Sequence, residues 1–341
     1  MIGERNIERF WEYVVALDFW TFHNPSDEKI ATAFLDTLTK FGFQPSKYGD
    51  QDPPKKRFDR LSRDKVVHEW VKHPGQLILE RLGENGFQAL LHLSQAQNRP
   101  VLITFALPDN YFGSANNVSK FLEFSEELYA LFRPFQGNIA HKKDWDDKTV
   151  AIAPIKIGER TIKAEVHNSP QPTKGLPGIF WANYLGPDYV HLYSKDKVES
   201  VPSYSKKELA DGGYLILTSP SPLDYAKPET KKIEQDIIEY LGRDAVFDKT
   251  LPDRPLRSPF LNRNEPYTPT AKSPLPSSMS SNLRACPECG EEKRTVETSK
   301  DRTNKLVGFK CLNCGAIWAV HTSLLRAPGR SFSRRLRRTI E

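Results

Sequence analysis

The chain has 341 residues, a length that suggests two folded units. Its hydrophobic content of 38% and its 19 Phe, 12 Tyr and 6 Trp can fill a core, which excludes wholesale disorder. No apolar run near the start reaches the length of a membrane span, and the first residues, MIGERNIERF, are charged where a signal peptide is apolar. We therefore expect a soluble, cytoplasmic protein.

Positive charge is concentrated at the C-terminus. The formal net charge is +6, and residues 285–341 hold 12 Lys and Arg against 6 Asp and Glu, so that the preceding residues are balanced. Such a skew favours long-range attraction to polyanions. A solvated basic tail that keeps the protein soluble would have the same composition.

The first third of the chain mixes helical and strand patterns. Two sets of apolar residues recur at helical spacing and predict two N-terminal helices: Ile7, Phe10, Trp11, Val14, Val15 and Phe19, then Ile30, Phe34, Leu38 and Phe41. An exposed loop (49–63) and a short helix (65–72) follow. Apolar runs at 87–93 and 101–107, joined by a polar segment, predict a β-hairpin.

Helical spacing returns at 118–132. Beyond it, strands are predicted at 149–157, 161–166, 178–184 and 213–218, and a helix at 229–241. Helices mixed with antiparallel strands indicate an α+β domain over residues 1–247. Residues 248–284 contain seven prolines and the run SPLPSSMSS, which is typical of a semi-extended Pro/Ser-rich linker. Residues 285–341 then form a small third unit.

All four cysteines lie in that last unit, as two CxxC pairs: Cys286 with Cys289, and Cys311 with Cys314. Each pair is followed by a glycine that permits a tight turn, and four converging thiolates form the tetrahedral site that Zn²⁺ prefers. Two disulfides would instead require an oxidising compartment. Segments of strand character lie between and after the pairs, so the sequence predicts a zinc ribbon whose folding depends on the metal.

The ribbon is followed by an arginine-rich tail, RAPGRSFSRRLRRTIE. Arginine forks match phosphate oxygens, so the tail and ribbon are expected to bind nucleic acid, RNA more than DNA because no major-groove helix is predicted. The residues expected to contact it are Lys310, Arg326, Arg330, Arg334, Arg335, Arg337 and Arg338. Phe309 and Trp318 could stack on bases or fill the ribbon core.

His321 is a candidate catalytic residue of this unit. It follows the last expected strand and could act as general base on a ribose 2′-hydroxyl, with arginines stabilising the phosphate. A non-ligating surface histidine is the usual alternative.

The large domain carries the turn GIFWANYLGP (178–187) and, later, the element ADGGYLILTSPSP (210–222). Together with the upstream hairpin and helix, this order resembles the immunity protein 52 family of bacterial polymorphic-toxin systems, over about residues 75–245. The resemblance implies a small cytoplasmic α+β protein that binds partner proteins without catalysis. It also implies that Trp181, Asn183 and Tyr184 belong to the scaffold or to a partner-facing loop.

The linker and zinc ribbon depart from that family. A protein-binding domain joined to a nucleic-acid-binding one is similar in layout to anti-phage proteins that release a zinc-finger ribonuclease. Within residues 1–247 the histidines show no metal spacing, and the acidic stretch 144–147 favours a solvated loop over a Mg²⁺ site.

We therefore expect a bacterial defence protein. Its first domain would sense an invader protein, and its zinc ribbon would bind RNA and, once activated, cleave it. The alternative is a non-enzymatic immunity protein that neutralises a nuclease toxin. A third hypothesis is a nucleic-acid adaptor with no role in defence. A homo-oligomer is compatible with activation by clustering.

Overall fold

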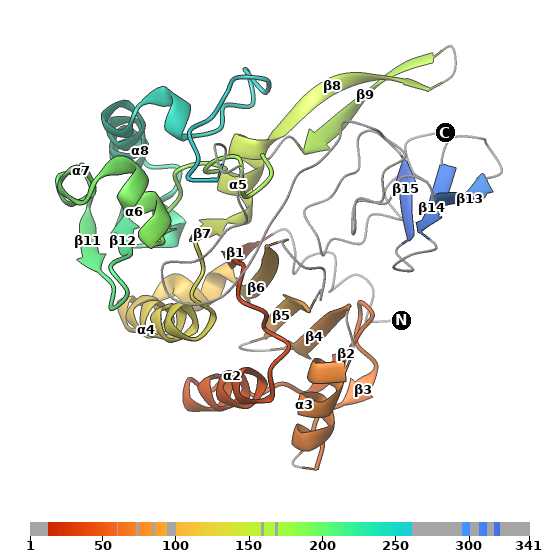
Figure 1. Cartoon of the computed structure of the whole chain (residues 1–341). Coiled ribbons are helices and arrows are strands. Elements are labelled where there is room, and N and C mark those ends of the chain that lie inside the picture. Colours follow the sequence, from red (N-terminus) through yellow and green to blue (C-terminus); the bar gives the residue numbers. More distant parts are fainter. Residues whose placement is uncertain are drawn as a thin grey trace.

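The computed structural model describes residues 13–59, 61–72, 75–83, 86–93, 100–157, 160–167 and 170–260, together with three strands between 295 and 320. From 152 to 167 and in those three strands it describes the backbone. The described part of the chain contains seven α-helices and an antiparallel sheet of ten strands, which confirms the α+β class (Figure 1).

The ten strands have the spatial order β11-β12-β10-β7-β1-β6-β5-β4-β2-β3. Their bounds are β1 Val14–Thr21, β2 Lys47–Gly49, β3 Lys56–Arg57, β4 Gln76–Arg81, β5 Phe87–His92, β6 Val101–Pro108, β7 Gln136–His141, β10 Ala182–Leu185, β11 Ser205–Glu208 and β12 Tyr214–Leu217. Strand β1 is central, since Val15 pairs with Leu107 of β6 on one side and with His141 of β7 on the other.

Seven helices flank or connect these strands: α2 Glu28–Lys40, α3 Arg63–Lys72, α4 Ala115–Phe132, α5 Lys142–Thr149, α6 Pro187–Tyr193, α7 Lys195–Glu199 and α8 Pro228–Leu241. Polar side chains fix where the longer ones begin. Asp27 accepts hydrogen bonds from the amides of Lys29 and Ile30 at the start of α2, and Ser114 accepts one from Asn117 at the start of α4.

Two apolar layers hold the helices to the sheet. Phe34 of α2, Trp70 of α3 and Phe124 of α4 are buried against one face of the sheet in a single cluster with Phe105 of β6. The opposite face at the β10–β12 end packs against α6, α7 and α8 in a second cluster. Aromatic rings dominate the first cluster, where Phe105 and Phe124 have centroids 4.7 Å apart.

The first predicted helix is wrong where the structure describes it. Residues Val14–Thr21 form strand β1, with Val15, Leu17 and Phe19 fully buried on one face. Val14 is also fully buried, and Ala16 nearly so, so the strand lacks the apolar–polar alternation that separates a strand from a buried helix. Residues 1–12 lie outside the described residues.

Most other predicted elements are confirmed. The segments predicted as helices at 118–132 and 229–241 are α4 and α8, and the predicted hairpin is β5 paired antiparallel with β6. The strand predicted at 178–184 begins only at Ala182, and the predicted loop at 49–63 contains the short edge strand β3.

Strands β8 Val150–Ile157 and β9 Arg160–His167 form a separate antiparallel hairpin, which extends away from the ten-stranded sheet in Figure 1. Both strands were predicted. The hairpin begins directly after α5, and the ammonium of Lys249 donates a hydrogen bond to the Val150 carbonyl at its base.

The body continues past residue 247. The Arg257 guanidinium pairs with Asp244 at 2.7 Å, and the Phe260 ring packs on Phe135 with centroids 4.8 Å apart. The first residues of the predicted linker (248–284) are therefore part of the packed body as far as Phe260, and residues 261–284 lie outside the described residues. None of the helices in the described ranges has the length and apolar character of a membrane span.

Candidate functional site

The C-terminal unit contains a small antiparallel sheet of three strands, β13 Thr295–Lys300, β14 Val307–Cys311 and β15 Ile317–Val320. Thr295, where the chain enters β13, pairs with Cys311, where it leaves β14. The start of β13, which follows the first CxxC pair, and the end of β14, where the second pair begins, therefore lie at the same end of this sheet. Cys286, Cys289 and Cys314 themselves lie outside the described residues.

The predicted nucleic-acid contacts are only partly placed. Lys310 lies in β14 and pairs with Ile317, and Phe309 pairs with Trp318 on the neighbouring strand. The chain leaves β15 at Val320, which pairs with Val307 at the end of the sheet opposite Cys311. His321 and the six tail arginines, Arg326, Arg330, Arg334, Arg335, Arg337 and Arg338, lie outside the described residues.

The GIFWANYLGP turn is built into the body. The Trp181 indole N–H donates to the Ser219 carbonyl at 2.8 Å, and the Asn183 amide bonds both the N–H and the carbonyl of Phe180, at 2.9 and 2.8 Å. The Tyr184 hydroxyl bonds the Ser125 hydroxyl at 2.6 Å. Trp181, Asn183 and Tyr184 are all buried, so these contacts fit the scaffold role and leave no partner-facing surface on the three side chains.

The DGG element, residues 211–213, is also fastened to the body by hydrogen bonds. The Tyr129 hydroxyl donates to both carboxylate oxygens of Asp211, at 3.0 and 3.1 Å, and Asp211 accepts a hydrogen bond from the Gly213 amide. Burial, with the nearby Asp211 charge, raises the pKa of Tyr129 far above its ordinary value. The hydroxyl therefore stays protonated and holds the turn before β12 against α4.

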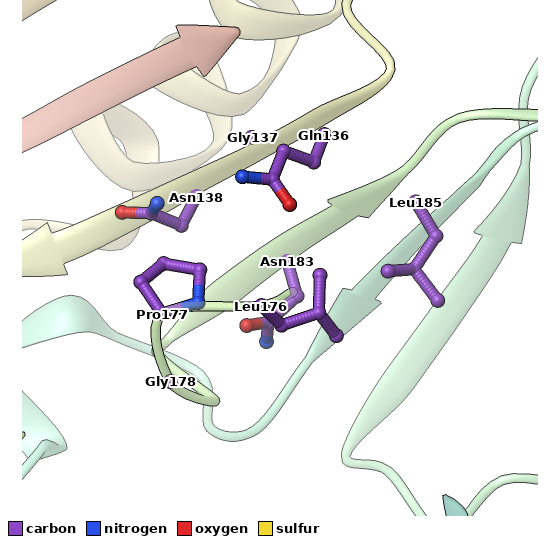
Figure 2. Close-up of a pocket in the computed structure, with 8 residues that line it drawn as sticks. All are labelled: Gln136, Gly137, Asn138, Leu176, Pro177, Gly178, Asn183 and Leu185. Atoms are coloured by element: carbon purple, nitrogen blue, oxygen red, sulfur yellow. The ribbon is translucent and has the colours of Figure 1, made fainter. Parts of the chain in front are cut away.

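A small hollow lies between β7 and β10, under the segment from Leu176 to Gly178 (Figure 2). It encloses about 10 Å³, room for no more than about one water molecule and far below the size of ordinary small-molecule sites. Gln136 and Asn138 line it and are 2% and 4% exposed, and their side-chain carbonyl oxygens have no hydrogen-bond partner. The hollow therefore offers two acceptors to a water-sized donor, and no titratable side chain lines it.

Sequence reasoning did not select Gln136 or Asn138. The available signal was two amides at alternate positions of the strand QGNIAH, which places both on one face of the strand.

The acidic stretch 144–147 forms part of helix α5, so the expected solvated loop is wrong. Asp144 is fully buried and pairs with Lys148 at 2.8 Å and with Lys231 of α8 at 2.7 Å. Glu234 pairs with the same two lysines at 2.9 and 3.1 Å. Each buried carboxylate is thus matched by an ammonium group, and the cluster ties α5 to α8 rather than holding Mg²⁺.

His141 is a buried histidine that the sequence patterns did not single out. Its Nδ1 accepts a hydrogen bond from the Lys143 amide, its ring stacks on Tyr225 with centroids 4.5 Å apart, and its Nε2 lies 3.8 Å from Asp109. Burial lowers the pKa of His141 more strongly than the Asp109 charge raises it. The neutral imidazole of His141 therefore caps the start of α5.

No group of three or more His, Cys, Asp or Glu side chains within the described ranges is arranged to hold a metal ion. The described body therefore offers structural polar contacts and small hollows, among them the one beside Gln136 and Asn138, while most of the candidate chemistry belongs to the C-terminal unit.

Comparisons with known proteins show no family for this chain. No family model and no curated protein matches it. Among solved structures, Pseudomonas aeruginosa T6SS protein PA0821 is weakly similar, with a TM-score of 0.42 and 11% identity over 71% of this chain and 87% of that chain. The resemblance to the immunity protein 52 family stays a prediction.

Proposed function

We propose that this chain is a cytoplasmic bacterial defence protein, in which the ten-stranded body recognises an invader protein and the C-terminal unit is a zinc ribbon that binds RNA. The observation that carries the proposal is the register of the small sheet, which pairs Thr295 with Cys311. One CxxC pair precedes Thr295 in the sequence and the other begins at Cys311. This arrangement supports convergence of four thiolates on one Zn²⁺.

The charge of the C-terminal unit supports RNA as the ligand. All of the net charge of +6 belongs to residues 285–341, and the arginine-rich tail follows the end of β15 that is opposite Cys311. Multiple guanidinium groups release counterions from a phosphate backbone, so binding would weaken steeply with salt.

The internal pairing of the polar groups of the body supports a role in protein recognition. The described charged cluster of Asp144, Lys148, Lys231 and Glu234 is paired internally, and the His141 and Asp211 contacts fasten helices and turns. These groups serve the fold, so the body is assigned to binding rather than to chemistry. Cleavage of RNA on activation is assigned to His321 of the C-terminal unit, as general base.

The test uses the full chain loaded with zinc. Fluorescence anisotropy with single-stranded RNA and DNA oligonucleotides is measured from low to physiological salt. We expect tighter binding to RNA, and a joint replacement of Arg334, Arg335, Arg337 and Arg338 by Gln should reduce the salt slope by about 0.7 for each lost phosphate contact. Arg57→Gln, in the exposed strand β3, is the matched control. If the full chain binds neither the RNA nor the DNA oligonucleotide at low salt, the proposal is overturned.

Cleavage is tested separately. His321→Ala should bind RNA as the wild type does and should lose cleavage in the presence of the activating protein, because the substitution removes the base without removing an arginine. Equal cleavage by the two proteins would remove His321 from the mechanism.

One observation favours the alternative of a non-enzymatic immunity protein. The body is packed as a unit through Phe260, so it could act without the C-terminal unit. Deletion of residues 285–341 distinguishes the two functions in cells that express candidate nuclease toxins or phage proteins. An immunity protein would still protect, whereas the proposed sensor would lose its effect.

A further inference from the structure

The ten-stranded sheet is apolar on both faces from β4 to β6. Alternate residues of these strands, such as Leu79, Ala89 and Phe105, belong to the first cluster. The residues between them lie on the opposite face, because successive residues of a strand alternate between faces. The apolar ones are Ile78, Leu90, Leu102 and Ala106, with Ala16 of β1 paired to Ala106. All of these are only 0–8% exposed, so this second face is buried as well.

None of the seven helices in the described ranges accounts for this burial. The buried apolar side chains of α2, α3 and α4 belong to the first cluster, and those of α6, α7 and α8 belong to the second. Trp145 of α5 stacks on Phe180. Neither cluster contains the second-face residues of β4, β5 and β6. Because an apolar sheet face must pack against another element, its cover comes from another segment of the chain or from another molecule.

Residues 1–12 join the sheet beside this second face. They lead through Tyr13 into Val14, the first residue of β1, which pairs with Pro108 at the end of β6. In the sheet, β6 and β5 lie between β1 and β4. Even as an α-helix this segment would span about 18 Å, whereas β1 and β4 are about 14 Å apart at the usual strand spacing. The segment is therefore long enough to cross β6 and β5 and reach β4.

The sequence of this segment supplies an apolar surface that suits the face. Ile7, Phe10 and Trp11 recur at helical spacing, and charged residues occupy the rest of the segment. On the sheet, Ala16 and Ala106 are small and directly paired. Since protein interiors are closely packed, a buried pair of alanines needs a large side chain above it. Phe10 and Trp11 are the large rings that come shortly before Ala16 in the chain.

The other long segments outside the described residues fit this face less well. Residues 261–284 are rich in Pro and Ser, and Tyr267 is their sole aromatic residue. Residues 285–341 carry all of the net positive charge and contain a small sheet of their own. The N-terminal segment is tethered next to the face by β1, which makes its effective concentration there high.

We propose that residues 1–12 dock as an amphipathic helix on the second face of β4, β5 and β6, with Phe10 and Trp11 over the Ala16–Ala106 pair. The N-terminal segment then adds a third apolar layer to the body and closes this face to partner proteins. The inference goes beyond the proposed function and does not depend on zinc, on RNA or on protein recognition.

The direct test places a photo-crosslinking residue in the segment of the full chain. In one variant p-benzoylphenylalanine replaces Trp11, and in the control it replaces Arg9, which lies on the other side of the expected helix. After irradiation, peptide mass spectrometry should find position 11 joined to peptides of β5 or β6. Position 9 should be joined to the same peptides at least about tenfold less often, because it faces away from the sheet.

Removal of the two rings tests what the contact contributes to stability. Joint replacement of Phe10 and Trp11 by Ser should lower the melting temperature of the body by about 5–10 °C, because two large side chains lose their buried surface. Joint replacement of Arg5 and Arg9 by Ser, in the same segment, is the matched control and should shift it by less than about 2 °C. The crosslinking result stands even if the first of these variants does not fold.

Three results would overturn the inference. The first is that position 11 crosslinks only to peptides outside β4, β5 and β6. The second is an equal melting temperature for the two serine variants. The third is that position 11 yields crosslinked dimers in place of internal crosslinks, because the face would then be covered by a second copy of the chain.

Discussion

Asp144 illustrates how single buried polar residues hold the body together. Its carboxylate is fully buried, yet it bonds Lys148 from the next turn of α5 and Lys231 from α8. A buried ion is costly unless it is paired, and removal of one partner of such a pair typically costs 3–5 kcal/mol. The same logic applies to Tyr129 and Asp211, which join α4 to the turn before β12.

Gly213 is the glycine at which a side chain would be least tolerated in that turn. A Cβ added there would lie 2.2 Å from the Tyr129 hydroxyl and 2.8 Å from the Leu185 carbonyl oxygen. Gly213→Ala should therefore destabilise the body by about 1–3 kcal/mol and lower its melting temperature by several degrees. Gly113→Ala is the control, since no atom lies within 4 Å of its added Cβ, and calorimetry should find it close to wild type. Equal melting temperatures for the two variants would contradict the packing described.

His141 should make stability depend on pH. Burial lowers its pKa in the folded protein, so below about pH 6.5 the unfolded chain takes up a proton that the folded chain resists. The free energy of unfolding should fall as pH drops through that range, and denaturant titrations at pH 7 and pH 5 measure the fall. In the His141→Asn variant the side chain can still accept the helix-cap hydrogen bond but cannot titrate. Its free energy of unfolding should therefore fall less between pH 7 and pH 5 than that of the wild type.

Burial also lowers the pKa of His23. Part of the fall in unfolding free energy at low pH should therefore remain in the His141→Asn variant. An identical pH dependence in wild type and His141→Asn would show that His141 does not contribute.

At the scale of elements, local signals and long-range pairing account for different parts of the fold. The helix over Glu28–Lys40 could be predicted because Asp27 caps it and its apolar residues recur at helical spacing. The hairpin of β5 and β6 could be predicted from two apolar runs. Strand β1 could not, because its edge partners β6 and β7 are remote in the sequence. Residues on both of its faces are buried, so the strand lacks the apolar–polar alternation that would mark it.

The same division applies to the candidate sites. Two CxxC pairs at this spacing are typical of a zinc site, so the cysteines could be selected as candidate ligands without a structure. The hollow beside Gln136 and Asn138 depends on the segment from Leu176 to Gly178 crossing over β7, which no local pattern contains. The strands β8 and β9 could be predicted from their sequence, but that they pair with each other outside the ten-stranded sheet required the topology.

At the scale of the whole molecule, the body and the C-terminal unit should respond differently to metal removal. In the proposed zinc ribbon the metal would supply most of the folding free energy, because the unit is small, so a chelator should abolish hydrogen-exchange protection of β13, β14 and β15. The melting transition of the body should be unchanged, because its core contains no metal ligands in the described ranges.

Cys286→Ser should reproduce the effect of the chelator without any added reagent. Zinc content measured by atomic emission should fall from one ion per chain in the wild type to a small fraction in this variant. Protection of β13–β15 that survives both treatments would rule out a structural metal.

The central place of β1 has a consequence for synthesis of the protein. Val15 meets its first neighbour only when Leu107 has left the ribosome, and its second only when His141 has followed. Before Leu107 emerges the apolar run VVALDFWT has neither flanking strand, and between the emergence of Leu107 and that of His141 one of its edges stays open. Chaperone demand during translation should therefore peak before β7 is complete.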